Sequence, residues 1–98
     1  MKIRFHYKGY FICDLDFAYK CGKVHEFGGE WNIDEVNLND LGKLVREIGV
    51  EGDYKLWYVI PGGSLNGGLR LLKTDRDCVR FINEFNNEVA ADFYVETP

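Results

Sequence analysis

The sequence lacks any long apolar run and any sign of secretion. No apolar stretch approaches the ~20 residues that a membrane-spanning helix needs. The opening residues, MKIRFHYKGYF, contain no apolar core of a signal peptide. The three cysteines are an odd number, which without a secretion signal points to free thiols in a reducing compartment. We therefore expect an intracellular protein, nuclear or cytoplasmic, with no membrane partner.

The sequence also lacks the residue groups that carry most chemistry. Cys21 and His25, even with Cys13 and His6, lack the paired spacing of a structural zinc site. Cys13 and Cys78 fall on predicted buried faces, where we expect them to be packing residues. No acid or oxyanion donor is placed to activate a thiol nucleophile. The glycine-rich loop 62–68 lacks the Gly-Lys-Ser/Thr ending of a phosphate-binding loop and leads into a strand. We predict a protein that is not an enzyme, with no cofactor, no metal site and no small-molecule substrate.

What is present is enough for one folded domain. The chain has 98 residues, 46% of them hydrophobic and 15% aromatic, which disfavours disorder. The net charge of −4 is spread along the chain and gives no general attraction for nucleic acid. We expect a single domain over residues 1–98, which could be the N-terminal part of a longer protein.

The stretch 54–72 is the clearest fold signal. Alternation predicts a central strand with two apolar faces, one of Leu56, Tyr58 and Ile60 and the other of Lys55, Trp57 and Val59. Pro61 ends this strand, glycines shape the loop, and a short strand resumes at Leu69. Further alternation predicts strands over residues 2–8, 11–20 and 91–96, the first two forming an N-terminal hairpin. A short extra strand is expected at 30–33.

Two helices are predicted. Leucine, valine and isoleucine recur at helical spacing over residues 38–48, with Asn37 or Asn39 as the candidate N-cap and Gly49 where a C-terminal cap belongs. A second helix is predicted after Thr74, which is a good N-cap, and Asp75 and Asp77 are interpreted as helix-capping residues. Its apolar stripe is expected to comprise Cys78, Phe81, Ile82, Phe85 and Val89. We predict an α+β fold of the ubiquitin-like β-grasp type, a mixed sheet of four to five strands with two helices packed on one face. The opening hairpin argues against the competing ferredoxin-like sheet.

Several segments resemble a known family. They are IRFHYKGYF at the start, FGGEW at 27–31, LGKLVREIGV at 41–50, KLWYVIPGGSLNGGLRLLKTDRD at 55–77 and ADFYVE at 91–96. In this order they are similar to the PB1-like domain, the Phox and Bem-one type of β-grasp module, of plant Mutator-like (MuDR-type) transposases and related plant proteins. The resemblance implies a β-grasp fold, a non-catalytic interaction or oligomerisation role and a nuclear context.

The resemblance also implies where a protein partner or a second copy would bind. Better-known domains of this type pair a basic strand surface on one copy with an acidic loop cluster on another, and Lys2, Arg4 and Lys8 match the basic side. The stretch 60–72 contains no acid, so the acidic side is missing. Any contact through that hairpin should be aromatic and apolar.

Two questions stay open at this point. The basic residues of the first strand either meet a partner or are neutralised by neighbours, with Asp14, Asp16, Asp92 and Glu96 as candidates. A nucleic-acid-binding role for the Lys2–Lys8 face is the alternative function, although net charge does not support it. Trp57 is either core or part of an open aromatic face. The predicted partner-binding residues are Lys2, Arg4, Lys8, Trp57, Val59 and Tyr94.

Overall fold

The protein is described by a computed structural model that covers residues 1–13 and 17–98. Five strands form the main sheet in the order β4-β1-β7-β5-β6. They are β1 (Lys2–Tyr7), β4 (Lys23–Phe27), β5 (Lys55–Val59), β6 (Leu69–Leu71) and β7 (Ala90–Glu96). The first and last strands lie parallel in mid-sheet, and the other neighbours are antiparallel. This is the ubiquitin-like β-grasp order, so the predicted fold is confirmed.

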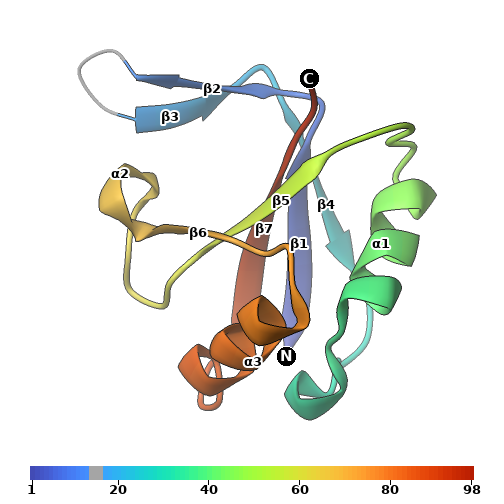
Figure 1. Cartoon of the computed structure of the whole chain (residues 1–98), viewed down its shortest axis with the longest axis vertical. Coiled ribbons are helices and arrows are strands. Elements are labelled where there is room, and N and C mark those ends of the chain that lie inside the picture. The colour runs from blue at the N-terminus through green and yellow to red at the C-terminus, as the bar shows by residue number, and fades with distance from the viewer. Residues whose placement is uncertain (14–16) are drawn as a thin grey trace.

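Both predicted helices cover the same face of the sheet, which we call the front face (Figure 1). They are α1 (Leu38–Glu47) and α3 (Asp75–Glu84), and a short turn, α2 (Leu65–Gly68), precedes β6. A 3-10 turn, η1 (Ile33–Glu35), precedes α1. The core is made by the front-facing strand residues and the inner helix residues. It includes Ile3, Phe5, Leu41, Val45, Leu56, Tyr58, Phe81, Phe85, Phe93 and Val95.

The caps predicted for the two helices are confirmed. The Asn37 side chain accepts from the Asp40 N–H at 2.9 Å and donates back to its carboxylate. Gly49 ends α1 with a φ of 90°, a left-handed conformation that glycine adopts without a steric penalty. Thr74 and Asp77 form a complete capping box at the start of α3. The predicted stripe of α3 ends earlier than expected, because Val89 lies beyond the helix and is 81% exposed.

The predicted N-terminal hairpin is wrong. The antiparallel partner of β1 is β4, and the intervening chain forms a separate two-stranded sheet of β2 (Tyr10–Cys13) and β3 (Phe17–Lys20). We call this pair the upper hairpin, since it lies at the top of the molecule in Figure 1. Alternation alone could not show that residues 11–20 contain two strands. The predicted roles of Asp14 and Asp16 fall outside the described residues.

Left-handed residues at its base direct the upper hairpin out of the main sheet. Lys8 and Cys21 both have positive φ, at 59° and 60°. Beside them Gly9 and Gly22 allow close approach, since a Cβ on Gly9 would lie 2.8 Å from the Cα of Gly22. The chain therefore leaves the sheet after β1 and returns to it as β4.

Two smaller expectations are also wrong. No strand forms at residues 30–33, because the extended segment lies earlier, at β4. Cys13 was expected on a buried face, but it is exposed at the end of β2, and Cys21 at the base of the upper hairpin is exposed too. Cys78 is buried on α3, as predicted.

Candidate functional site

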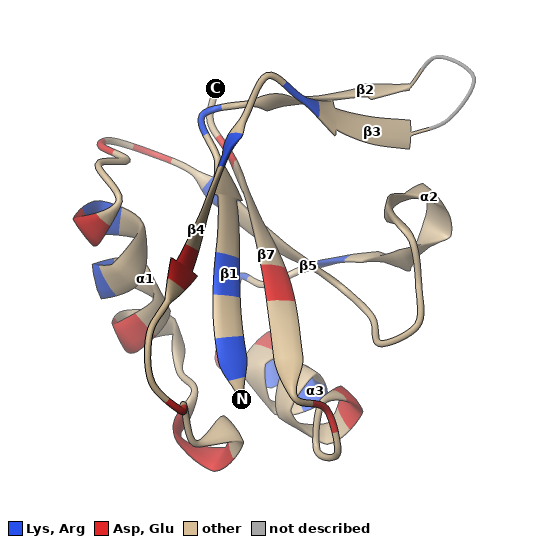
Figure 2. Ribbon diagram, turned by 180° about the vertical axis from the view of Figure 1, so that it is seen from behind, with Lys and Arg blue, Asp and Glu red and all other residues tan. Residues whose placement is uncertain are grey.

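The back face of the sheet, opposite the helices, carries the predicted basic residues. Arg4 lies on β1 with Glu26 opposite it on β4 and Asp92 opposite it on β7. Figure 2 shows this face, with the basic positions of β1 between acidic positions of the two neighbouring strands. The strand order that makes the β-grasp fold therefore places acids on both sides of Arg4.

Arg4 forms a close ion pair with Asp92. Its Nε lies 3.0 Å from Asp92 Oδ1, and its Nη2 donates to Oδ2 at 3.1 Å. The Nε2 of His6 lies 2.9 Å from the same carboxylate. These contacts, first that of His6 and then those of Arg4, hold the pKa of Asp92 below its usual value. Of the two alternatives for the basic residues, the structure shows the second for Arg4: its charge is neutralised by an acid on the neighbouring strand.

Lys2 shares the back face with Arg4, but Lys8 does not join them. Lys2 is exposed at the first residue of β1. Lys8 follows the other end of the strand, and its Nζ lies 3.7 Å from the position that a Cβ on Gly49 would take, at the C-terminus of α1. A cation there is favourable for the helix dipole. The prediction that Lys2, Arg4 and Lys8 contact a partner stays a prediction, but they do not make a continuous patch.

Trp57 lies on the back face, which answers the question that the sequence left open. In register it pairs with Tyr94, and Tyr94 pairs with His6 on β1. The rings of His6 and Tyr94 stack at 4.2 Å. Trp57 donates its Nε1–H to Glu96 Oε1 at 3.0 Å.

The upper hairpin covers this aromatic row, so the row is not an open surface. The Phe11 ring lies 6.4 Å from the Trp57 ring and 6.0 Å from the Tyr94 ring. The Tyr19 ring lies 5.4 Å from that of Tyr94. As a result Trp57 and Tyr94 are half-buried, and Val59 further along β5 is half-buried too, beside Leu69. Sequence reasoning could not foresee this cover, since it assigned Phe11 and Tyr19 to one strand of the main sheet.

Tyr19 fastens the upper hairpin to the sheet. Its hydroxyl donates to the Val95 carbonyl at 2.9 Å and accepts from the Gly9 N–H at 2.9 Å. Burial of the phenol raises the pKa of Tyr19. One side chain thereby joins the base of the upper hairpin to the C-terminal strand.

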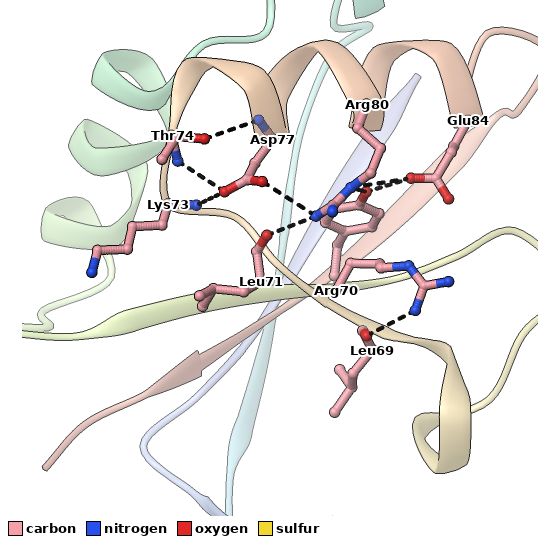
Figure 3. A network of polar contacts seen from close by, with 9 residues as sticks. Leu69, Arg70, Leu71, Lys73, Thr74, Asp77, Arg80 and Glu84 are labelled. Atoms are coloured by element: carbon pink, nitrogen blue, oxygen red, sulfur yellow. Dashed lines mark hydrogen bonds and ion pairs between the residues drawn. The ribbon is translucent and has the colours of Figure 1, made fainter.

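The acids just after the central hairpin belong to the helix cap. Asp77 accepts from the backbone N–H groups of Lys73 at 2.8 Å and Thr74 at 2.9 Å, and these bonds lower its pKa. Arg80 lies 3.5 Å from the other oxygen of the same carboxylate (Figure 3). Asp77 is thus engaged within the domain, which agrees with its interpretation as a capping residue.

A polar network on α3 was not predicted from the sequence. The hydroxyl of the buried Tyr58 donates to Glu84 and accepts from Arg80 Nε at 3.1 Å. Arg80 Nη2 also donates to the Leu71 carbonyl at 2.9 Å, as Figure 3 shows. Burial and the Glu84 bond raise the pKa of Tyr58 to about 12. The helical spacing of Arg80 and Glu84 was the available signal for a pair, but nothing in the sequence linked that pair to Tyr58.

A large hollow lies at the edge of β5 where β6 leaves it, a place that sequence reasoning did not consider. Its volume is about 880 Å³. We call it the β5-edge groove, and its walls are formed by Leu38, Asp53, Tyr54, Lys55, Leu56, Leu71, Leu72, Lys73, Glu96, Thr97 and Pro98. Small-molecule and cofactor pockets commonly have volumes of about 300–1,000 Å³. The groove mixes leucines with two lysines and two acids, and carries no catalytic group of recognisable geometry.

The family model of the PB1-like domain matches residues 1–97. No curated protein and no solved structure matches the chain. Within residues 1–13 and 17–98, no cluster of three or more histidine, cysteine or acidic side chains is placed to hold a metal ion. None of the helices in this described part is long and apolar enough to cross a membrane.

Proposed function

Because the chain belongs to the PB1-like domain family, whose members are protein-interaction modules and not typically catalytic, we propose that it is a protein–protein interaction or oligomerisation domain. We further propose that it serves as an accessory domain of a plant transposase-like protein and acts in the nucleus. The observation that carries the proposal is the family match over residues 1–97. The resemblance of the LWYVIPG and TDRD segments supports the plant transposase context.

The partner surface that we propose is the back face. Helices cover the front face, whereas the back face beyond the upper hairpin is built from strand residues alone (Figure 2). Lys2 supplies a free charge there, Arg4 is paired with Asp92, and Val59 supplies apolar surface beside the half-buried Trp57 and Tyr94. Such a mixed surface suits a partner whose charges set specificity and association rate. Lys8 would lie at the margin of that surface.

Nucleic-acid binding has less support than protein binding. The guanidinium of Arg4 is held by Asp92, and Glu26 lies on its other side. With a net charge of −4 and no continuous basic patch on β1, the domain offers few free cations for phosphates.

The proposal is tested by charge reversal at exposed lysines. Lys2→Glu removes a free cation of the back face, and the matched control Lys43→Glu changes an exposed lysine on α1. We expect proteins captured from plant nuclear extract, and any concentration-dependent mass in light scattering, to fall with Lys2→Glu and to persist with Lys43→Glu. A strictly monomeric domain whose captured proteins are the same for wild type and both variants would contradict the proposal. Binding of labelled duplex DNA at low salt, abolished at high salt, would favour the nucleic-acid alternative.

A further inference from the structure

The β5-edge groove lies where the backbone of a sheet is left unpaired. On the side of β5 that faces β6, the Leu72 N–H donates to the Leu56 carbonyl at 2.8 Å, and this is the last bond of the ladder. β6 has only three residues, and the chain then turns into the cap of α3. In an antiparallel ladder the N–H of a residue points to the same side as its carbonyl, so the Leu56 N–H also faces the β6 side. Within the described residues it donates to no backbone carbonyl outside the strands, and neither backbone group of Tyr54 is paired with another backbone group. The start of β5 is therefore a short open edge inside a groove.

The walls of the groove alternate as the two sides of a strand do. Leu56 and Leu72 belong to the front, apolar side, where Leu38 also lines the groove. Lys55 and Glu96 are register partners and belong to the back side. A strand laid along this edge would place alternate side chains against the leucines and against the charged pair. The groove thus fits an extended chain better than a helix or a compact ligand.

We propose that the β5-edge groove binds an extended peptide segment of a partner protein, which adds to β5 as a further strand. Main-chain hydrogen bonds to Leu56 and Tyr54 supply affinity, and apolar side chains at every second position of the peptide pack between Leu38 and Leu72. The rim carries Lys55 and Lys73 but also Asp53 and Glu96, so it favours neither sign of charge. This inference rests on the proposed role as an interaction domain, but it uses a different surface from the back face.

The probe is a library of random heptapeptides displayed on phage and selected on the full chain, followed by synthesis of an enriched peptide. We expect apolar residues at alternate positions and slower hydrogen exchange of the Leu56 amide when the peptide is bound. Strand addition predicts that exchange effect because it gives this N–H an acceptor, whereas binding elsewhere leaves the amide unchanged.

Two variants test whether the peptide binds in the β5-edge groove. Thr97→Trp adds bulk at an exposed wall position, and Leu38→Gln removes an apolar wall; each should weaken binding about tenfold, the loss of one or two good contacts. The matched control Val24→Trp adds the same bulk on the opposite edge strand, at a residue that is 60% exposed, and should leave binding intact. Lys2→Glu should also leave it intact, which separates this proposal from the back-face proposal.

Several results would overturn the inference. One is a selection that enriches no peptide. Another is peptide binding that is lost with Val24→Trp and kept with Thr97→Trp. A third is a hydrogen-exchange rate of the Leu56 amide that does not change when the peptide binds. A rise in mass with concentration that Thr97→Trp abolishes would also overturn it, because a second copy would then occupy the groove. If Lys2→Glu loses the captured proteins but no peptide binds the β5-edge groove, the proposed function stands and the inference about the groove is refuted.

Discussion

The two faces of the central sheet use the same strands for different purposes. On the front face, Ile3, Phe5, Phe93 and Val95 are almost completely buried under two helices. On the back face, Arg4, His6 and Asp92 share an ion-pair cluster, and aromatic rings meet the upper hairpin. Successive residues of β7 alternate between these two environments. The front face therefore carries most of the stability, and the back face carries the charged and aromatic contacts.

This difference has a physical cause in what covers each face. Burial under helices requires apolar side chains, because a buried polar group without a partner is costly. The back face is covered only by a two-stranded hairpin, so charged and aromatic residues keep contact with water there. Substitutions on the two faces should accordingly change the free energy of unfolding by different amounts and with different pH dependence.

The largest expected effect lies on the front face. Phe93→Ala removes a ring that is fully buried and lies 5.2 Å from the rings of both Phe5 and Phe81. We expect the free energy of unfolding, measured by urea titration, to fall by about 3–5 kcal/mol. The control Val89→Ala, at a residue 81% exposed, should change it by less than ~0.5 kcal/mol. Equal losses for the two variants would remove the distinction between a buried face and an exposed surface.

A smaller effect is expected at the network between β5 and α3. Tyr58→Phe removes the hydroxyl shared by Glu84 and Arg80, which water can partly replace, so the loss near neutral pH should be ~1 kcal/mol. Because the pKa of Tyr58 is raised from 10.0 to about 12, the unfolded chain loses this proton first as pH rises. Wild-type stability should therefore fall between pH 10 and 12 more steeply than that of Tyr58→Phe. Parallel pH curves in thermal unfolding would contradict this assignment.

The smallest effect is expected on the back face. Asp92→Asn removes a carboxylate that is about one-third exposed, so the loss at neutral pH should be about 0.5–1 kcal/mol. The pKa of Asp92 is lowered in the folded protein, so its stabilisation is full above the ordinary value of 3.8 and is lost as pH falls through the lowered one. Wild type should lose more stability on acidification below that value than Asp92→Asn does. If Asp92→Asn loses as much stability on acidification as wild type does, the Arg4–His6–Asp92 cluster adds nothing to the free energy of unfolding.

Much of the front face could be predicted from the sequence. Alternation at Leu56 and Tyr58, helical spacing in α1 and α3, and the caps at Asn37 and Thr74 are local signals, and the structure confirms each of them. The order of the predicted strands and helices along the chain indicated the β-grasp plan, which the sheet also confirms.

The back face could not be predicted as well, because its contacts depend on which strands pair. Residues 11–20 alternate like a strand of the main sheet, and only the left-handed turns at Lys8 and Cys21 send them elsewhere. Because β4 and not residues 11–20 pairs with β1, the neighbours of Arg4 and Trp57 differ from those that the sequence predicted. The β5-edge groove depends on where β6 ends, and the sequence gives no sharp signal for that point.

The parallel pairing of β1 and β7 has a mechanical consequence. The N-terminal end of β1 and the C-terminal end of β7 lie at opposite ends of the sheet (Figure 1). A pulling force applied at Lys2 and Glu96 would load the hydrogen bonds between these strands in shear, all at once, instead of opening them one after another. The bonds of a parallel ladder are evenly spaced, so the load would be shared among them. The domain should therefore resist tension along the chain more strongly than a hairpin that is pulled apart from its open end.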